Sequence, residues 1–206
     1  MPRAQPVIPF PAFRPDLNDL GTEVSSLISG VVPRADGWGP FKDFVGFTQA
    51  LPAACRGFFF ARRSDGSIAV FAGTADRLYL LNNTTFAWDD VSKGGVAYGS
   101  LIPSKNWRFA QFNEFVLAAQ INTVPQKYVL TTGPTFVDLG GSPPQAGQIA
   151  IVNRIVVLTE LLSNPRRAQW SDLDAPETWT AGVGLADFQD FPDGGVCHAL
   201  SGGDAY

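Results

Sequence analysis

Charged residues are scarce in this chain of 206 residues. They make up 17% of it, against about a quarter in ordinary globular proteins. Lysine and arginine number 15 and the acidic residues 19, which gives a net charge of −4, and the basic residues form no run. A basic face that reads a DNA sequence is therefore not expected, because such a face depends on clustered lysine and arginine.

Histidine and cysteine are equally rare, with one and two residues. His198 follows Cys197, but a metal site needs three or four such ligands. Adjacent side chains of a strand point to opposite faces, so the pair is not predicted to act as a nucleophile and its base. We expect no metal, no cofactor and no enzymatic activity. Cys55 and Cys197 are predicted to be buried reduced thiols, with a disulfide as the alternative.

Long apolar runs are missing as well. The longest extends from Ile149 to Leu162 and is interrupted by Asn153, Arg154 and Glu160, so it is too short and too polar to cross a bilayer. The N-terminal sequence MPRAQPVIPFPAFRPDL alternates prolines with apolar residues and lacks the apolar core of a signal peptide. We therefore expect neither a membrane segment nor a secretion signal.

The N-terminal region, residues 1–40, is predicted to be an extended arm. Its prolines remove N–H donors and fix φ, which disfavours helix and central strand. Residues 21–32 are compatible with a short strand or a helical turn, and residues 33–41 form a turn cluster around Trp38. An apolar arm needs a surface to lie on, so it is predicted to dock on a neighbouring subunit or on its own domain. The candidate interface residues of the arm are Val7, Ile8, Phe10, Phe13, Arg14, Asp16 and Trp38.

Residues 41–206 read as short strands separated by turns. Glycine (21) and proline (16) are abundant, and from residue 67 onward no segment has apolar residues at helical spacing over three turns. The pattern predicts strands at 56–63, 67–74, 76–82, 85–91, 107–112, 114–120, 126–132, 135–141, 148–153, 154–161, 166–173 and 178–182. The fold class is therefore predicted to be all-β.

The strands repeat. Thr85-Phe86 recurs as Thr135-Phe136, and the preceding strands SIAVFAG, EFVLAAQ and RIVVLTE correspond to one another. A unit of about 45 residues with four strands is typical of a β-propeller blade. The sequence predicts about three blades, an incomplete propeller that would be the N-terminal part of a longer one, and residues 191–206 resemble the opening strand of a fourth blade. A β-sandwich is the alternative.

The stretch WSDLDAPETW, residues 170–179, carries three carboxylates between two tryptophans. A glycosidase uses two carboxylates that converge from different segments, whereas these three lie in one short stretch. We interpret it as a turn between two blade strands, shaped by Asp174 and Pro176, with Trp170 and Trp179 packing between blades. Asp172 and Glu177 are candidates for a subunit interface. The spacing also resembles the Asp-box hairpin of sialidase-type propellers, with Asp in place of Ser and Pro in place of Gly; that hairpin is structural.

Several motifs in order resemble a known family. FRPD at residues 13–16, GVVP at residues 30–33 and GWGP at residues 37–40 look like the opening of the tail nozzle, or packaged-DNA stabilisation, proteins of short-tailed bacteriophages. The downstream stretches NWRFAQFNEFVLAA, AQWSDLDAPETW and ADFQDFPDGG are similar to strands of that family's propeller. Chains of the family are several hundred residues long, so this chain departs from them in length.

The resemblance implies a structural virion protein, made in the bacterial host cytoplasm and assembled in the tail as a homo-oligomeric ring. Such a ring would contact the tail adaptor and portal-proximal proteins. It would let double-stranded DNA pass through its lumen without sequence-specific binding and retain the packaged genome until ejection. The alternatives from other classes are a propeller hydrolase acting on glycan and a generic propeller interaction module.

Overall fold

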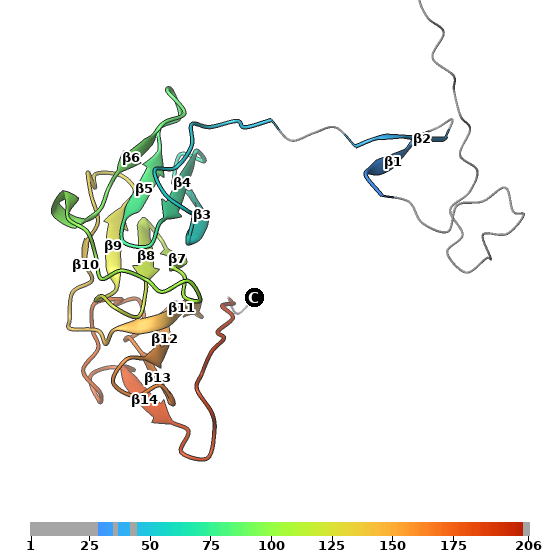
Figure 1. Ribbon diagram of the computed structural model, residues 1–206. Coiled ribbons are helices and arrows are strands. Elements are labelled where there is room, and N and C mark those ends of the chain that lie inside the picture. Colours follow the sequence, from blue (N-terminus) through green and yellow to red (C-terminus); the bar gives the residue numbers. More distant parts are fainter. Residues whose placement is uncertain (1–28, 35–36, 42–44, 204–206) are drawn as a thin grey trace, which may run out of the picture. The chain divides into compact units, whose positions relative to one another are not determined.

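The computed structural model describes residues 29–34, 37–41 and 45–203, and the chain divides into two compact units, residues 1–46 and 47–206 (Figure 1). The described part of the first unit is an antiparallel hairpin. Its strands are β1 (Val31–Arg34) and β2 (Gly37–Pro40), with Val31 opposite Pro40. For residues 21–32 the sequence was compatible with a short strand or a helical turn, and for residues 33–41 it predicted a turn cluster. The prediction is wrong for β2, which is a strand within the expected turn cluster. The calls on residues 1–28 lie outside the described residues.

The second unit contains three antiparallel sheets of four strands each. In every sheet the strands follow one another in chain order, so each sheet is a simple meander. The first sheet comprises β3 (Gly57–Arg62), β4 (Ile68–Gly73), β5 (Leu78–Leu81) and β6 (Trp88–Asp90). The second comprises β7 (Arg108–Phe112), β8 (Phe115–Ala119), β9 (Gln126–Val129) and β10 (Val137–Asp138). The third comprises β11 (Ala146–Val152), β12 (Ile155–Leu161), β13 (Arg167–Trp170) and β14 (Asp187–Asp190).

The prediction of an all-β fold with three four-stranded units is confirmed by these sheets. The only helical element in the described residues is a short 3-10 turn, η1 (Lys93–Gly95). The described residues do not close a ring of sheets, so propeller closure stays a prediction.

Two details of the third sheet differ from the expectation. Residues 178–182 were expected to form its fourth strand, but β14 lies further along, at Asp187–Asp190, and pairs with β13. Residues 191–203 were expected to open a fourth unit, yet they contain no strand. Gly203 instead makes a single parallel bridge to Val152 at the end of β11. Tertiary pairing, and not local composition, fixes both segments.

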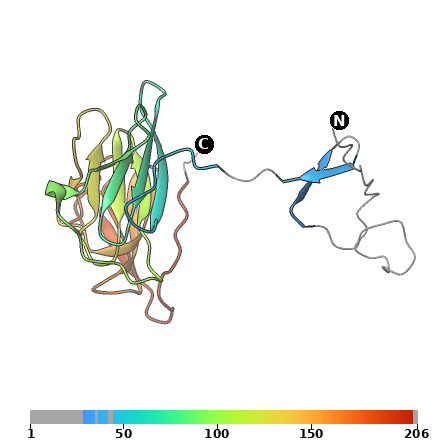
Figure 2. The same cartoon turned by 45° about the horizontal axis from the view of Figure 1, so that its top comes forward.

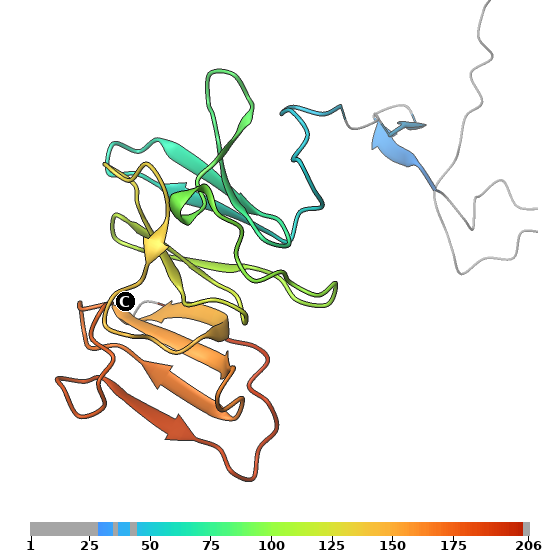
Figure 3. The same cartoon turned by 60° about the vertical axis from the view of Figure 1, so that its left-hand side comes forward.

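The sheets stack face to face, with their first strands β3, β7 and β11 next to one another (Figures 2 and 3). A core cluster between the first and second sheets contains Phe71, Leu78, Val116, Tyr128 and Phe136. A second cluster lies between the second and third sheets and contains Leu117, Leu139, Val156, Leu158 and Trp179. The second sheet thus buries both faces, because strand residues alternate between its two neighbours.

Trp107, just before β7, joins the first two sheets. Its side chain is almost fully buried, and its indole Nε1 donates a hydrogen bond to the carbonyl of Thr74 at 2.9 Å. Its backbone N–H donates to the carbonyl of Arg56 at 2.7 Å. Gly57 and Gly73 lie beneath it, and a Cβ on either would overlap Trp107 atoms. The two glycines therefore create the space that the indole fills.

Candidate functional site

The acidic loop, residues 170–179, begins at the end of β13 and forms the first part of the connection to β14 in the third sheet. The same slot holds residues 82–87 in the first sheet and residues 130–136 in the second, so the predicted position between third and fourth strands is confirmed. Within the loop, the Asp172 N–H donates to Thr178 O at 3.0 Å and the Thr178 N–H donates to Ala175 O at 3.0 Å. These bonds close a compact turn with no strand at its end.

The two tryptophans of the acidic loop have different surroundings. Trp179 is buried in the core between the second and third sheets, and its indole donates to the carbonyl of Pro176 at 2.8 Å. Trp170 is half-buried, and its indole donates to the carbonyl of Leu185 at 2.8 Å. Trp179 therefore anchors the loop to the joint between two sheets, while Trp170 holds the next segment of the same connection.

Glu177 links the third sheet to the second. Its carboxylate accepts from Lys127 Nζ on β9 at 2.6 Å and from the Gly140 N–H at 3.0 Å. The Lys127 hydrogen bond, helped by Gly140, holds the pKa of the Glu177 carboxyl below its ordinary value although burial acts the other way. The charged carboxylate of Glu177 therefore forms an ion pair within the chain.

The other two carboxylates of the loop also have partners within the third sheet. Asp174, which has a positive φ of 57°, accepts from Arg154 Nε at 2.6 Å and pairs with its Nη2 as well. Asp172 Oδ1 accepts from the N–H groups of Leu173 at 2.8 Å and Leu185 at 2.7 Å. The three carboxylates therefore point to three separate partners and do not converge on one reacting centre, as a hydrolase pair would.

A site that the sequence analysis did not single out surrounds Glu160 on β12. Glu160 is buried, pairs with Lys105 Nζ and accepts from Gln148 Nε2 at 3.2 Å, and His198 Nδ1 lies 3.4 Å away. Burial raises the pKa of the Glu160 carboxyl, but the hydrogen bonds from Lys105 and Gln148 outweigh burial and set that pKa below its ordinary value. The one signal in the sequence was a lone acid inside an apolar run.

A pocket of about 180 Å³ opens beside Glu160. Lys105, Arg108, His198 and Gln148 line it, so two cationic groups, an imidazole and an amide surround one carboxylate. Gly147 lies under the carboxylate, where a Cβ would overlap it. In the described residues no group of three or more His, Cys, Asp or Glu side chains could hold a metal ion. The pocket is thus an ion-paired joint in which Lys105, from the connection before β7, meets the third sheet.

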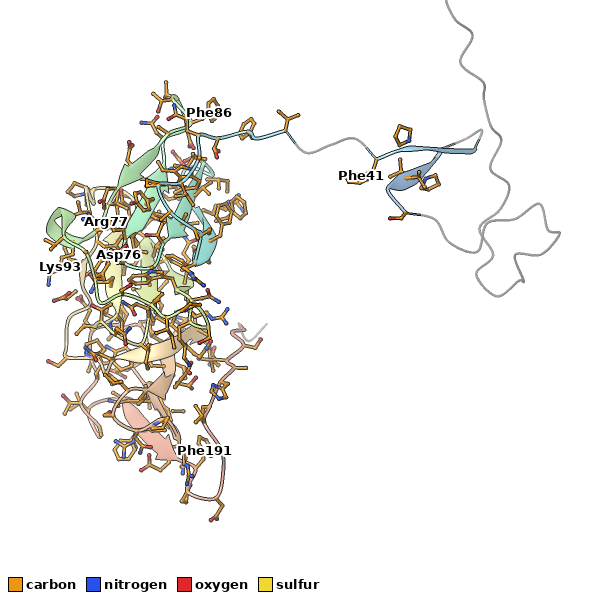
Figure 4. All side chains as sticks on the ribbon, viewed as in Figure 1. Phe41, Asp76, Arg77, Phe86, Lys93 and Phe191 are labelled. Carbon is orange, nitrogen blue, oxygen red and sulfur yellow. The ribbon has the colours of Figure 1, made fainter. Side chains whose placement is uncertain are left out.

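Lysine–carboxylate pairs bridge neighbouring sheets at both joints. Lys93 of η1 pairs with Asp138 of β10 at 2.5 Å, which joins the first sheet to the second. Lys93 and Arg77 are labelled on the same side of the stack in Figure 4. The Lys93 hydrogen bond holds the pKa of the Asp138 carboxyl below its ordinary value. Together with Lys127–Glu177, these pairs fix the stacking of the sheets in addition to the apolar cores.

The remaining predicted site residues are placed as follows. The arm residues Val7, Ile8, Phe10, Phe13, Arg14 and Asp16 lie outside the described residues. Trp38 lies in β2 opposite Pro33. Cys55 and Cys197 are free thiols, as predicted, but Cys55 is exposed and Cys197 half-buried, so the expectation that both are buried is wrong. The subunit-interface role of Asp172 and Glu177 stays a prediction.

No protein-family model matches the chain, and a search of curated proteins finds no match. Within the part of the chain that the structure describes, no helix has the length and apolar character needed to cross a membrane.

Proposed function

We propose that this chain is a structural subunit of the tail nozzle of a short-tailed bacteriophage, in which its stacked sheets form part of a propeller-type ring. The observation that carries the proposal is the stacking of three four-stranded meanders with their first strands β3, β7 and β11 side by side. Propeller blades are arranged in this way around their axis. The ordered motifs FRPD, GVVP and GWGP supply the link to the tail family.

The proposed ring is homo-oligomeric and continues the DNA conduit below the portal and adaptor. The net charge of −4 supports a wall that repels the phosphate backbone, so that DNA passes without being held by sequence-specific contacts. The protein would retain the packaged genome until ejection, in the virion tail, after synthesis in the bacterial host cytoplasm.

The intramolecular bonds of the acidic loop support a structural role in preference to a catalytic one. Glu177 bridges two sheets and Asp174 pairs with Arg154 within the third sheet, so both charges are used in ion pairs inside the fold. A conduit subunit requires rigid joints because pressure from packaged DNA acts on its wall. The propeller hydrolase alternative would need carboxylates from two segments in one pocket, whereas the three carboxylates of the acidic loop bind separate partners.

Particles of the phage that encodes this chain provide the test. Antibody against the chain should label the tail in immuno-electron microscopy, and particles assembled without it should contain DNA that is accessible to nuclease. A matched control is the same phage carrying the intact gene, whose DNA should stay protected. Labelling away from the tail, or protected DNA in particles that lack the chain, would contradict the proposal.

A further inference from the structure

The first sheet has an apolar face that neither the second nor the third sheet covers. Its leading face, defined here as the face that looks away from the second sheet, carries Phe58, Phe60, Val70, Ala72, Tyr79, Leu81 and Trp88. Val70, Ala72 and Tyr79 are buried, whereas Phe58 is 50% exposed and Phe60 63% exposed. Phe58 and Phe60 contact each other with ring centroids 5.0 Å apart, and Phe58 also meets Trp88 at 6.3 Å. An exposed aromatic group of this kind marks an interaction surface.

The register of the repeats shows what this face corresponds to. Phe58 lies opposite Ala72 in the first sheet, as Phe109 lies opposite Ala118 in the second. In the third sheet the equivalent pair is Ile149 opposite Leu158. Ala118, Ile149 and Leu158 are buried, each in the cluster between its own sheet and the sheet before it. The leading face of the first sheet thus has the same construction as two faces that each receive a sheet.

The second row of the repeat agrees. Phe60 lies opposite Val70 in the first sheet, and the equivalent valines are Val116 in the second sheet and Val156 in the third. Val70, Val116 and Val156 are all buried, so the difference lies in the first strand: Phe60 is exposed, whereas its counterparts Gln111 and Ile151 are half-buried. Gln49 contacts this face, where the Trp88 indole donates to the Gln49 carbonyl oxygen at 3.0 Å.

The matching surface lies at the other end of the stack. The trailing face of the third sheet, which looks away from the second sheet, carries Ala150, Val152, Ile155, Val157 and Trp170. Val157 lies opposite both Ala150 and Trp170, and Val157 and Trp170 are half-buried while Val152 is exposed. The equivalent trailing faces of the first and second sheets are buried at joints. Gly203 pairs only with the edge of β11 and leaves Val157 and Trp170 partly uncovered.

We propose that the leading face of the first sheet binds the trailing face of the third sheet of a second copy of this chain, head to tail. Each such joint would repeat the two joints already present within the chain. Two copies together supply six four-stranded sheets, which falls in the propeller range of about four to eight blades. A head-to-tail contact of this kind closes into a ring when its rotation fits. The proposal rests on the propeller arrangement inferred above but not on a place in a virion.

Two single substitutions and their mixture test this pairing by sedimentation and light scattering of the purified chain. The wild type should have twice the chain mass of 22.1 kDa. Phe60→Glu and Val157→Glu should each be monomeric, because a buried unpaired carboxylate opposes the joint. Mixing the two variants should restore a dimer, since one contributes an intact third sheet and the other an intact first sheet. If the dimer formed instead between the first sheets of two copies, Val157→Glu would dimerise by itself. Mixing it with Phe60→Glu would then give no dimer that contains both variants.

The control is Ile102→Glu, which alters an apolar side chain that is 59% exposed and belongs to no strand. It should leave the dimer intact. Val152→Glu on the same trailing face replaces the Val157 variant if circular dichroism shows that the latter does not fold. A monomeric wild type at high concentration, a dimeric Phe60 variant, or a mixture that stays monomeric would overturn the pairing. If Phe60→Glu abolishes the dimer but the antibody does not label the phage tail, only the tail function is contradicted. If the antibody labels the tail but Phe60→Glu still forms the dimer, only the pairing is contradicted.

Discussion

The indole of Trp107 lies directly against the Cα of Gly73, and this contact between two sheets depends on the absence of a side chain at that glycine. We predict that Gly73→Ala lowers the free energy of unfolding by about 1–3 kcal/mol, because the added methyl group must displace a buried tryptophan. Urea denaturation followed by tryptophan fluorescence measures it. Gly195→Ala, where a Cβ meets open space, is the control and should be near neutral. Equal stability of both variants would contradict the packing.

The Lys127–Glu177 pair is predicted to couple the second and third sheets. A double-mutant cycle with Lys127→Met and Glu177→Gln should give a coupling free energy of about 0.5–1 kcal/mol, since Lys127 is mostly buried and Glu177 is 44% exposed. The comparison is Arg154→Met with Asp174→Asn, a more exposed pair within the third sheet, which should give a smaller coupling free energy. A larger value for the exposed pair would argue against a bridging role for Glu177.

The ionisation of Glu160 should make the free energy of unfolding depend on pH in the acidic range. Its carboxyl has a pKa below the ordinary value of 4.5, so its contribution to stability is present above that value and is lost as the pH falls through the lowered pKa. Glu160→Gln should cost about 1–3 kcal/mol at pH 7, because Lys105 loses its buried partner. Denaturation at pH 7 and pH 3 should show the gap between wild type and variant narrowing in acid. A gap that stays constant or widens would mean that the carboxylate is not charged in the folded chain.

The hydroxyl of Ser171 is predicted to stabilise the start of the acidic loop. Ser171 is fully buried and its Oγ accepts a hydrogen bond from the Val156 N–H at 3.0 Å. Ser171→Ala leaves that buried N–H without its side-chain acceptor, which should cost about 1–3 kcal/mol by thermal or urea denaturation. Ser201→Ala, at an exposed position, should change stability by less than about 0.5 kcal/mol. If the two variants are indistinguishable, the buried hydrogen bond contributes little.

Most strands were predictable because each carries alternating or β-branched residues between turn residues. In β3, Phe59 packs in a core cluster while Phe60 is exposed, as alternation requires, and Gly66 with a φ of 83° makes the turn to β4. The count of three four-stranded units followed from a repeat of about 45 residues, seen in the corresponding strands SIAVFAG, EFVLAAQ and RIVVLTE. Alternation and turn chemistry are local, so a single sequence contains them.

The position of β14 was not predictable from local pattern. Thr178 and Trp179 have the residue types of a strand, yet they form none. The Trp179 side chain packs instead in the core between two sheets. Asp187–Asp190 looks like a polar turn but pairs with β13, where Arg167 meets Asp190 at 2.7 Å and lies over Phe188. Tertiary contacts decide both segments.

The joints between sheets were likewise missed. Trp107 was read as an ordinary strand residue, and Glu160 as an interruption of an apolar run. Their roles depend on partners distant in the chain, which are Gly73 for the tryptophan and Lys105 for the carboxylate. The acidic loop was placed in the correct slot, but nothing in its sequence indicated that Glu177 reaches Lys127 on another sheet.

Negative-stain electron microscopy of the purified chain, combined with its mass from light scattering, addresses the ring most directly. The proposed function requires particles of more than one copy that show a ring with a central opening. A compact particle with the mass of one 22.1 kDa chain and no opening would contradict it.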